Sequence, residues 1–109
     1  MPGDPRLLQL LDDLGLSMGR MGDIPEAREI FEDLYLRRRE SLGPEHDTTL
    51  NTMGRLAVMR AMDDDLEPAA QLQRERAEIS ARKLGAEHPT TLSERGNLAN
   101  MLLGLRQYE

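Results

Sequence analysis

The sequence predicts an all-α protein, a right-handed α-solenoid of antiparallel helix pairs with about two and a half repeats. Leu, Ala, Met, Glu and Arg dominate while aromatic residues make up only 3% of the chain, a composition typical of helices rather than strands. Apolar residues recur at steps of three and four residues between turn signals. A short segment also occurs twice, which indicates repeated helical units.

The repeat extends along the whole chain. The segment LGPEHDTTL begins at Leu42 and its counterpart LGAEHPTTL begins at Leu84, an offset of 42 residues. The same offset pairs Gly54 with Gly96. The 109 residues are therefore expected to form one domain. It divides into repeat 1 over residues 1–43, repeat 2 over residues 44–85 and a truncated repeat 3 over residues 86–109.

The first helix of each repeat is predicted at residues 5–20, 47–62 and 89–104. Asp4 precedes Pro5, and His88 precedes Pro89. Each pair places a polar cap ahead of a proline at the first helical position, where the missing N–H removes no helical hydrogen bond. These two positions are therefore expected to start helices.

The second helix of a repeat is predicted at residues 24–41 and 66–83. Asp23 and Glu26 have the spacing of a capping box, and Asp65 is expected to cap the later helix. Gly43 and Gly85 follow the last turns, where a left-handed residue lets the chain reverse. The short loops make each pair antiparallel. Since one hairpin cannot bury its apolar face alone, successive hairpins are expected to stack.

The connector over residues 42–50, with its copy over residues 84–92, resembles that of tetratricopeptide repeats (TPRs) of the longer, kinesin-light-chain-like variety with a 42-residue repeat. The small residues that this family places in its first and second helices are matched by Gly15, Ala57, Ala99, Ala27 and Ala69, and its large apolar position by Phe31. The resemblance covers nearly the whole chain. It implies stacked helix pairs whose first helices line a concave, peptide-binding groove.

Four polar residues occupy positions at which the family usually has apolar or small side chains. They are Arg60, Gln73, Arg76 and Arg95. Either these side chains extend their polar ends to water along apolar stems, or the second and third units pack more loosely than the first. The sequence leaves both explanations open.

Repeat 3 is expected to be incomplete. Subtracting two repeats places Tyr108 at the position of Ile24, so the chain stops as the second helix of that repeat begins. We expect the natural protein to continue further. Apolar surface left on the helices at 66–83 and 89–104 then predicts self-association, such as a homodimer through the terminal repeat.

The resemblance also implies which residues face the groove. They are Gln9, Asp12, Asp13, Leu16 and Arg20, then Asn51, Arg55, Val58 and Met62, then Ser93, Asn97 and Asn100. Asparagine can bond a peptide backbone as donor and acceptor, arginine can bind a carboxylate, and the apolar members offer contact area. The alternative is that these residues are only the solvated sides of helices.

The net charge of −6 argues against a nucleic-acid partner. The basic run over residues 37–39 is interpreted as solvated surface, because its members point in three directions on a helix. The lack of cysteine excludes disulfides and thiolate sites. No apolar run approaches the roughly 18 residues of a membrane span, and the first five residues lack a signal pattern. A cytoplasmic protein without membrane contact is expected.

Residues with catalytic or metal-binding chemistry have simpler structural interpretations. His46 and His88 recur at equivalent helix starts, which favours capping or local packing over acid–base or metal chemistry. The acidic run over residues 63–65 lacks the ligand spacing of a calcium loop and is interpreted as a solvated turn. Asp12 and Asp13 are adjacent on a helix and cannot form a facing carboxylate pair. No catalytic residue, cofactor or metal is predicted, and enzymatic activity is not expected.

The preferred hypothesis is a protein–protein interaction scaffold that binds a peptide in the concave groove, within a larger bacterial regulatory or signalling protein. The bacterial context is implied by the resemblance to sensor regions that carry such repeats and by the content of Arg, Ala and Gly. The alternative hypothesis is a structural module that dimerises or stacks through its terminal repeat, near Met101 and Leu105.

Overall fold

The computed structural model describes residues 4–107, with side chains for residues 4–105, and this part of the chain contains helices and no strand. The helices are α1 (Pro5–Arg20), α2 (Ile24–Leu42), α3 (Asp47–Met62), α4 (Leu66–Leu84) and α5 (Pro89–Gln107). The predicted all-α class and the order of the helices are confirmed. Tyr108 and Glu109, on which the expected truncation of repeat 3 depends, lie outside the described residues.

Helix α5 continues three residues beyond its predicted end at residue 104. Asp63, Asp64 and Asp65 follow α3, and the equivalent positions of α5 are Leu105, Arg106 and Gln107. Leu, Arg and Gln are better helix formers than Asp, whose side chain competes for backbone hydrogen bonds. The longer helix therefore follows from the loss of the acidic turn.

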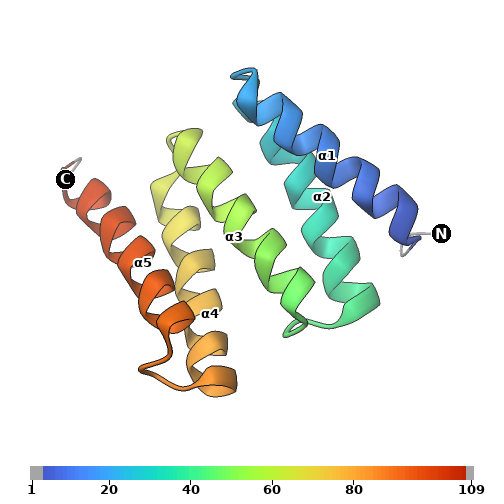
Figure 1. Cartoon of the computed structure of the whole chain (residues 1–109). Helices are drawn as coiled ribbons and strands as arrows, with labels where there is room; N and C mark the ends of the chain where they lie inside the picture. The colour runs from blue at the N-terminus through green and yellow to red at the C-terminus, as the bar shows by residue number, and fades with distance from the viewer. Residues whose placement is uncertain (1–3, 108–109) are drawn as a thin grey trace.

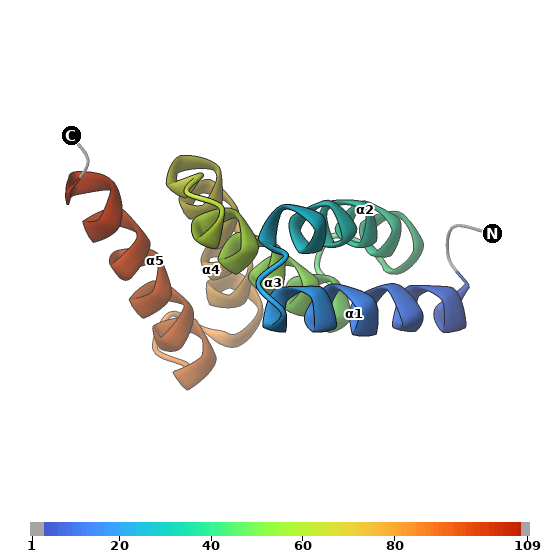
Figure 2. The same ribbon diagram turned by 90° about the horizontal axis from the view of Figure 1, so that it is seen from above.

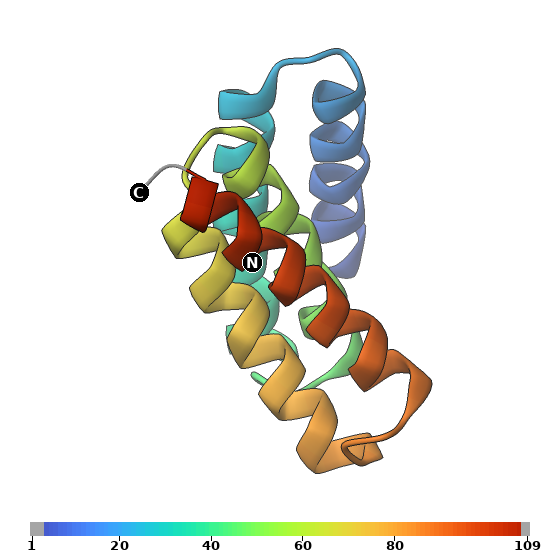
Figure 3. The same cartoon turned by 90° about the vertical axis from the view of Figure 1, so that its left-hand side faces the viewer.

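The helices stack in chain order into a short solenoid (Figure 1). Each helix packs against its neighbours along the chain, and neighbouring helices run antiparallel. Seen from above, α1 and α2 lie at one end, α4 and α5 at the other, and α3 between them (Figure 2). The view along the stack shows that α4 and α5 are inclined to α1 and α2 (Figure 3). Helix α3 therefore connects the two hairpins.

Three of the five polar residues that precede helices cap them through their side chains. Asp4 accepts a hydrogen bond from the Arg6 amide at 3.0 Å, while His46 and His88 each accept one from an amide two residues later at 3.1 Å. These bonds confirm Asp4 as a cap and the local capping interpretation of both histidines. An imidazole Nδ1 that accepts an amide hydrogen bond is engaged in the fold.

The predicted side-chain caps at Asp23 and Asp65 are wrong. Neither side chain makes a capping hydrogen bond, and the ψ angles of 64° and 65° lie outside the extended region that turns a cap towards the first amides. The Asp65 carboxylate instead accepts a hydrogen bond from Arg28 at 2.7 Å. At both positions the backbone carbonyl still accepts the first helical bond, from Ala27 and Ala69 respectively.

Two equivalent glycines end the second helices. Gly43 has φ 101° and Gly85 has φ 104°, and the amide of each bonds the carbonyl four residues before it at 3.0 Å. Residues other than glycine rarely adopt this backbone conformation. An added Cβ would meet nothing within 4 Å at either position. The positive φ expected at these two turns is confirmed, and backbone conformation alone explains the glycines.

The core lies between α1, α2 and α3. Phe31, Leu34, Met53 and Leu56 are fully buried there. A Cβ added to Gly15 would lie 2.9 Å from the Phe31 ring, so α1 and α2 approach closely because this glycine has no side chain. Large apolar residues of α2 and α3 thus hold the first repeat against the second.

The interpretation of residues 37–39 as solvated surface is wrong at Arg38. Its side chain is 7% exposed, and its Nη1 donates to Asp12 at 3.1 Å and to Thr52 at 2.9 Å. Arg37 pairs with Asp33 on the surface of α2, as the interpretation expected. The helix turns Arg38 inward because it lies four residues after buried Leu34.

Candidate functional site

A cavity of about 560 Å³ lies between α1 and α3. It is lined by Leu16, Phe31, Asn51, Gly54, Arg55, Val58, Met59 and Arg76. Two smaller cavities lie beside it, one of about 320 Å³ between α3, α4 and α5 and one of about 340 Å³ between α4 and α5. Arg76 lines all three cavities. We call these three cavities together the groove, because Arg76 and Asn51 join the first to the second, and Arg76, Thr90 and Glu94 join the second to the third.

Half of the residues predicted to face a groove line these cavities. They are Leu16, Asn51, Arg55 and Val58 in the first cavity, and Ser93 and Asn97 in the third. The others that are exposed but line none of the three are Gln9, Asp13, Arg20, Met62 and Asn100. Three of the four predicted residues of α3 thus share the first cavity with Leu16 of α1, and two predicted residues of α5 line the third.

Asp12 lies beneath the groove rather than on it. It is only 6% exposed, and its carboxylate accepts hydrogen bonds from Arg38 of α2 and Arg55 of α3. Asp12 therefore ties three helices together, and Arg55, whose side chain is 41% exposed, is the member of this cluster that lines the first cavity. The spare donors of that guanidinium face the first cavity and suit a carbonyl or carboxylate of a partner.

A second buried charge pair joins α4 to α5. Arg76 Nε lies 3.1 Å from Oε1 of Glu94, whose side chain is 5% exposed. The two groups are close but not aligned, because Arg76 Nε and Glu94 Oε2 are buried without a hydrogen-bond partner among the described residues. A Cβ added to Gly54 would lie 2.8 Å from Arg76 Cζ, so the glycine leaves room for the guanidinium at the centre of the groove.

The four polar residues that depart from the family pattern all have hydrogen-bond or ion-pair partners in the structure. Arg60 donates to Glu32 at 2.6 Å and to the Pro68 carbonyl at 3.2 Å, and Gln73 donates to the Glu94 carbonyl at 2.9 Å. Arg76 pairs with Glu94, and Arg95 contacts the Ala86 carbonyl at 3.4 Å. Arg60, Gln73 and Arg76 thus bind neighbouring helices instead of extending to water. The sequence analysis did not identify Glu32 and Glu94, the acidic residues that pair with Arg60 and Arg76 respectively.

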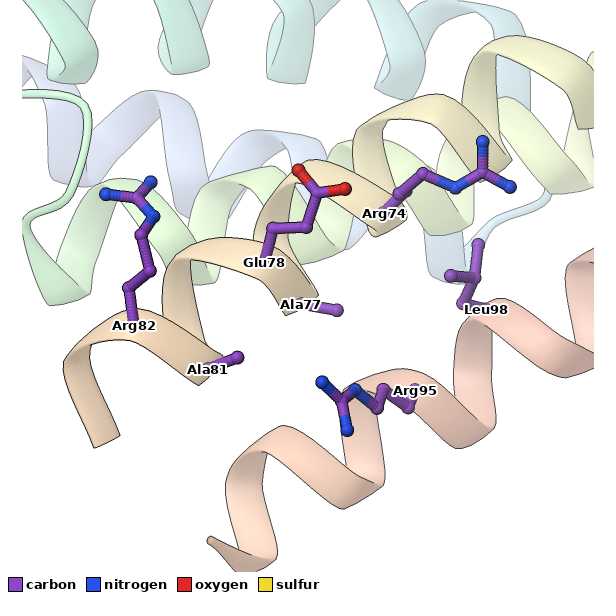
Figure 4. A pocket seen from close by; sticks show the side chains of 7 residues that line it. All are labelled: Arg74, Ala77, Glu78, Ala81, Arg82, Arg95 and Leu98. Atoms are coloured by element: carbon purple, nitrogen blue, oxygen red, sulfur yellow. The ribbon is translucent and has the colours of Figure 1, made fainter. Parts of the chain in front are cut away.

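Leu98 of α5 is less well covered than its counterpart in the preceding unit. Leu98 is half-buried, whereas its counterpart Leu56 has no exposed surface. A cavity of about 500 Å³ lies between α4 and α5, lined by Arg95 and Leu98 of α5 and by Arg74, Glu78 and Arg82 of α4 (Figure 4). Ala77 and Ala81 form its floor on α4. This outer cavity lies away from the groove and shares no lining residue with it.

Two further features bear on ligands. Within the described side chains, no three histidine or acidic groups gather closely enough to hold a metal ion. In the acidic turn, Asp63 and Asp65 both accept hydrogen bonds from Arg28, whose pKa is raised chiefly by the bond to Asp65. Across residues 4–107, every helix is too short or too polar to span a bilayer.

The comparisons with known proteins agree with this geometry. The tetratricopeptide repeat family profile matches residues 6–82. Two crystal structures, one of them of a variant, contain the nearly identical TPR-like repeats of a Podosopora anserina protein assigned as a kinesin light chain. Each aligns with a TM-score of 0.86 at 25% identity over 99% of this chain and 52% of the other. No curated protein matches the sequence significantly.

The chain therefore spans about half the length of these solved repeats. The family match covers most of the chain, and the structural match extends across the α5 region that the profile leaves out. The predicted resemblance is confirmed on both counts. The chain belongs to the tetratricopeptide repeat family, in its kinesin-light-chain-like variety.

Proposed function

We propose that this protein binds a peptide segment of a partner protein in the groove formed by α1, α3 and α5. The family fold is that of a protein–protein interaction scaffold, generally without catalysis. The observation that carries the proposal is the run of three cavities that meet at Arg76. Val58 is 46% exposed in the first cavity, and apolar side chains there can accept a peptide side chain.

The polar residues of the groove suit an extended peptide. Asn51 lies where two cavities meet, and Asn97 lines the third. Each amide can donate to a peptide carbonyl and accept from a peptide N–H, which satisfies a backbone that has no sheet partner. Arg55 adds a charged donor beside them. The groove thus offers backbone recognition along its length and apolar contact at one end.

The proposal is tested with a phage-displayed library of random heptapeptides, selected on the immobilised chain. Peptides that survive selection are synthesised and titrated by fluorescence anisotropy against the wild type and Asn51→Ala. Loss of one or two backbone hydrogen bonds is expected to weaken binding about fivefold to tenfold. Gln71→Ala, an exposed amide on α4 outside every cavity described above, is the matched control. Selection of no peptide, or equal binding by Asn51→Ala, contradicts the proposal.

The second candidate function is self-association through α4 and α5. It is favoured by the half-buried Leu98 in the cavity of Figure 4, where the equivalent residue of the preceding unit is fully covered. Light scattering over a wide concentration range tests it. A mass that rises with concentration and falls back in Leu98→Glu supports association through this face, and a constant monomer mass contradicts it.

The wider context extends the same proposal. The chain would serve as the recognition module of a larger, cytoplasmic bacterial regulatory or signalling protein. The resemblance to kinesin-light-chain-like repeats and the composition support this assignment. Expression of tagged full-length protein followed by fractionation tests the location, and recovery in a membrane or secreted fraction contradicts it.

A further inference from the structure

The two repeat interfaces can be compared residue by residue, because the offset of 42 residues places equivalent positions in each. Arg38 of α2 corresponds to Ser80 of α4, and Thr52 of α3 corresponds to Glu94 of α5. All four residues are buried. The first interface thus has a long cation facing a hydroxyl, and the second has a short hydroxyl facing a carboxylate.

In the first interface the arginine fills the space between the helices. Arg38 Nη1 donates to Thr52 Oγ1 at 2.9 Å, and the same nitrogen reaches Asp12 at 3.1 Å. The Thr49 hydroxyl also donates to the Arg38 carbonyl at 3.3 Å. A buried guanidinium in this place is therefore fully compatible with the stacking of two repeats.

In the second interface the corresponding space is open. The cavity of about 320 Å³ is lined by Asp47, Leu50, Asn51, Arg76, Ser80, Leu84, Thr90 and Glu94. The hydroxyl of Thr91, which corresponds to Thr49, has no hydrogen-bond partner among the described residues. Replacement of the long Arg38 by the short Ser80 explains why a cavity of several water molecules' volume remains here.

The cavity contains a carboxylate that lacks part of its hydrogen bonding. Glu94 is 4% exposed, and its Oε2 is buried without a partner among the described residues. A buried carboxylate oxygen without a hydrogen bond is unfavourable, so a hydrogen bond from a ligand's donor to it contributes favourably to the binding free energy. Glu94 lines the cavity, so a donor placed there lies beside this carboxylate.

The cavity is lined by two acidic residues and one basic residue. Asp47 and Glu94 are its acidic residues, and Arg76 is its one basic lining residue. Lys83 lies 3.1 Å from Asp47, but the Asp47 side chain remains 90% exposed and can still face a ligand. Arg76 Nε approaches Glu94 without an aligned hydrogen bond, so it does not satisfy the carboxylate.

We propose that this cavity receives a basic side chain, preferentially an arginine, of the peptide bound in the groove. The incoming guanidinium takes the place that Arg38 occupies in the first interface and donates to Glu94, as Arg38 donates to Thr52. Arginine is preferred over lysine because its planar group makes two parallel bonds to a carboxylate. This inference rests on the proposed function and names the chemistry of the ligand.

The test uses the heptapeptides selected on the wild-type chain. We expect them to share an arginine, and its replacement by alanine in a synthetic peptide to weaken binding about tenfold or more, with lysine in between. Ser80→Arg places an arginine of the protein in this cavity, as Arg38 fills the equivalent space of the first interface. This variant is expected to reduce the affinity for the peptide to a similar extent. Glu94→Gln removes the charge with little change of shape, and it is also expected to weaken peptide binding. This variant provides the test if Ser80→Arg does not fold.

Glu87→Gln is the matched control, because Glu87 is exposed and lines none of the cavities described. Its affinity is expected to stay within about twofold of the wild type. Selected peptides without a basic residue, or peptides that bind Ser80→Arg and Glu94→Gln as tightly as the wild type, overturn the inference while groove binding stands. Binding that is also unaffected by Asn51→Ala, or selection of no peptide, overturns groove binding and the inference together.

Discussion

Asp12→Ala is expected to destabilise the protein strongly, although the residue lies on the first helix of the chain. The substitution leaves Arg38 buried at 7% exposure with the Thr52 hydroxyl as its remaining side-chain partner. Removal of one member of a buried ion pair costs about 3–5 kcal/mol, because the other charge stays in the interior. Arg55 is 41% exposed and returns to water, so only one stranded charge contributes. The expected loss is therefore about 3 kcal/mol.

Urea denaturation followed by circular dichroism measures this loss. Asp13→Ala is the matched control, since Asp13 is exposed and bonds only Gln9 on the helix surface among the described side chains. Both variants gain the same helix propensity from alanine, so the difference between them isolates the buried pair. The control is expected to stay within about 0.5 kcal/mol of the wild type. A difference below about 1 kcal/mol between the two variants refutes the reasoning.

A second variant separates the stranded charge from other effects of Asp12→Ala. Adding Arg38→Met removes the guanidinium and leaves an apolar side chain of comparable length in the same space. Replacing both members of a buried pair by apolar groups is often close to neutral. The double variant is therefore expected to be more stable than Asp12→Ala alone. Arg38→Met alone completes the comparison. If the double variant loses as much unfolding free energy as Asp12→Ala and Arg38→Met lose together, the two residues do not interact.

Three further predictions concern stability. Gly15→Ala is expected to lower the free energy of unfolding by about 1–3 kcal/mol in urea denaturation, because its Cβ would lie 2.9 Å from the fully buried Phe31 ring. An unchanged or higher stability contradicts the close approach. Arg28→Met is expected to cost about 0.5–1 kcal/mol at low salt and less at about 1 M NaCl, since its partner Asp65 is 42% exposed; a salt-independent loss argues against the ion pairs. Burial raises the pKa of Tyr35, so the folded state holds this proton more tightly and stability falls as pH rises above about 10. Thermal melts of Tyr35→Phe should show a weaker fall than the wild type, and identical pH profiles contradict the assignment.

The helices and the repeat were predictable from local signals. The apolar steps, the prolines at helix starts and the two connectors act over a few residues, and they located every helix to within three residues of its observed bounds. The caps at His46 and His88 followed from their recurrence alone. The caps at Asp23 and Asp65 failed because cap geometry depends on backbone angles that composition does not determine.

The buried charges were not predicted, because each depends on a partner distant in sequence. Arg38 is 26 residues from Asp12, and the pair exists only once α1 and α2 have packed. A usable signal was present, since Arg38 continues the buried face set by Leu34 and Tyr35. Glu94 gave no such signal, as the open space beside it results from the short side chain of Ser80 on another helix.

The predicted groove residues were carried over from the family, and the structure distinguishes among them by burial and position. Asp12 supports the groove from below, while Asn51 and Arg55 line it. Which of them contact a partner remains a prediction. A peptide held in the groove must lie against α3, because residues of that helix line the first two cavities.

The most direct test of the account is a map of backbone amide shifts of the ¹⁵N-labelled chain during titration with a selected heptapeptide. Binding in the groove predicts shifts that cluster around Leu16, Asn51 and Arg55, with the α4 residues of the outer cavity, Arg74, Glu78 and Arg82, unchanged. Shifts confined to the face of α4 and α5 around Leu98, or spread without a cluster, would contradict peptide binding in the groove.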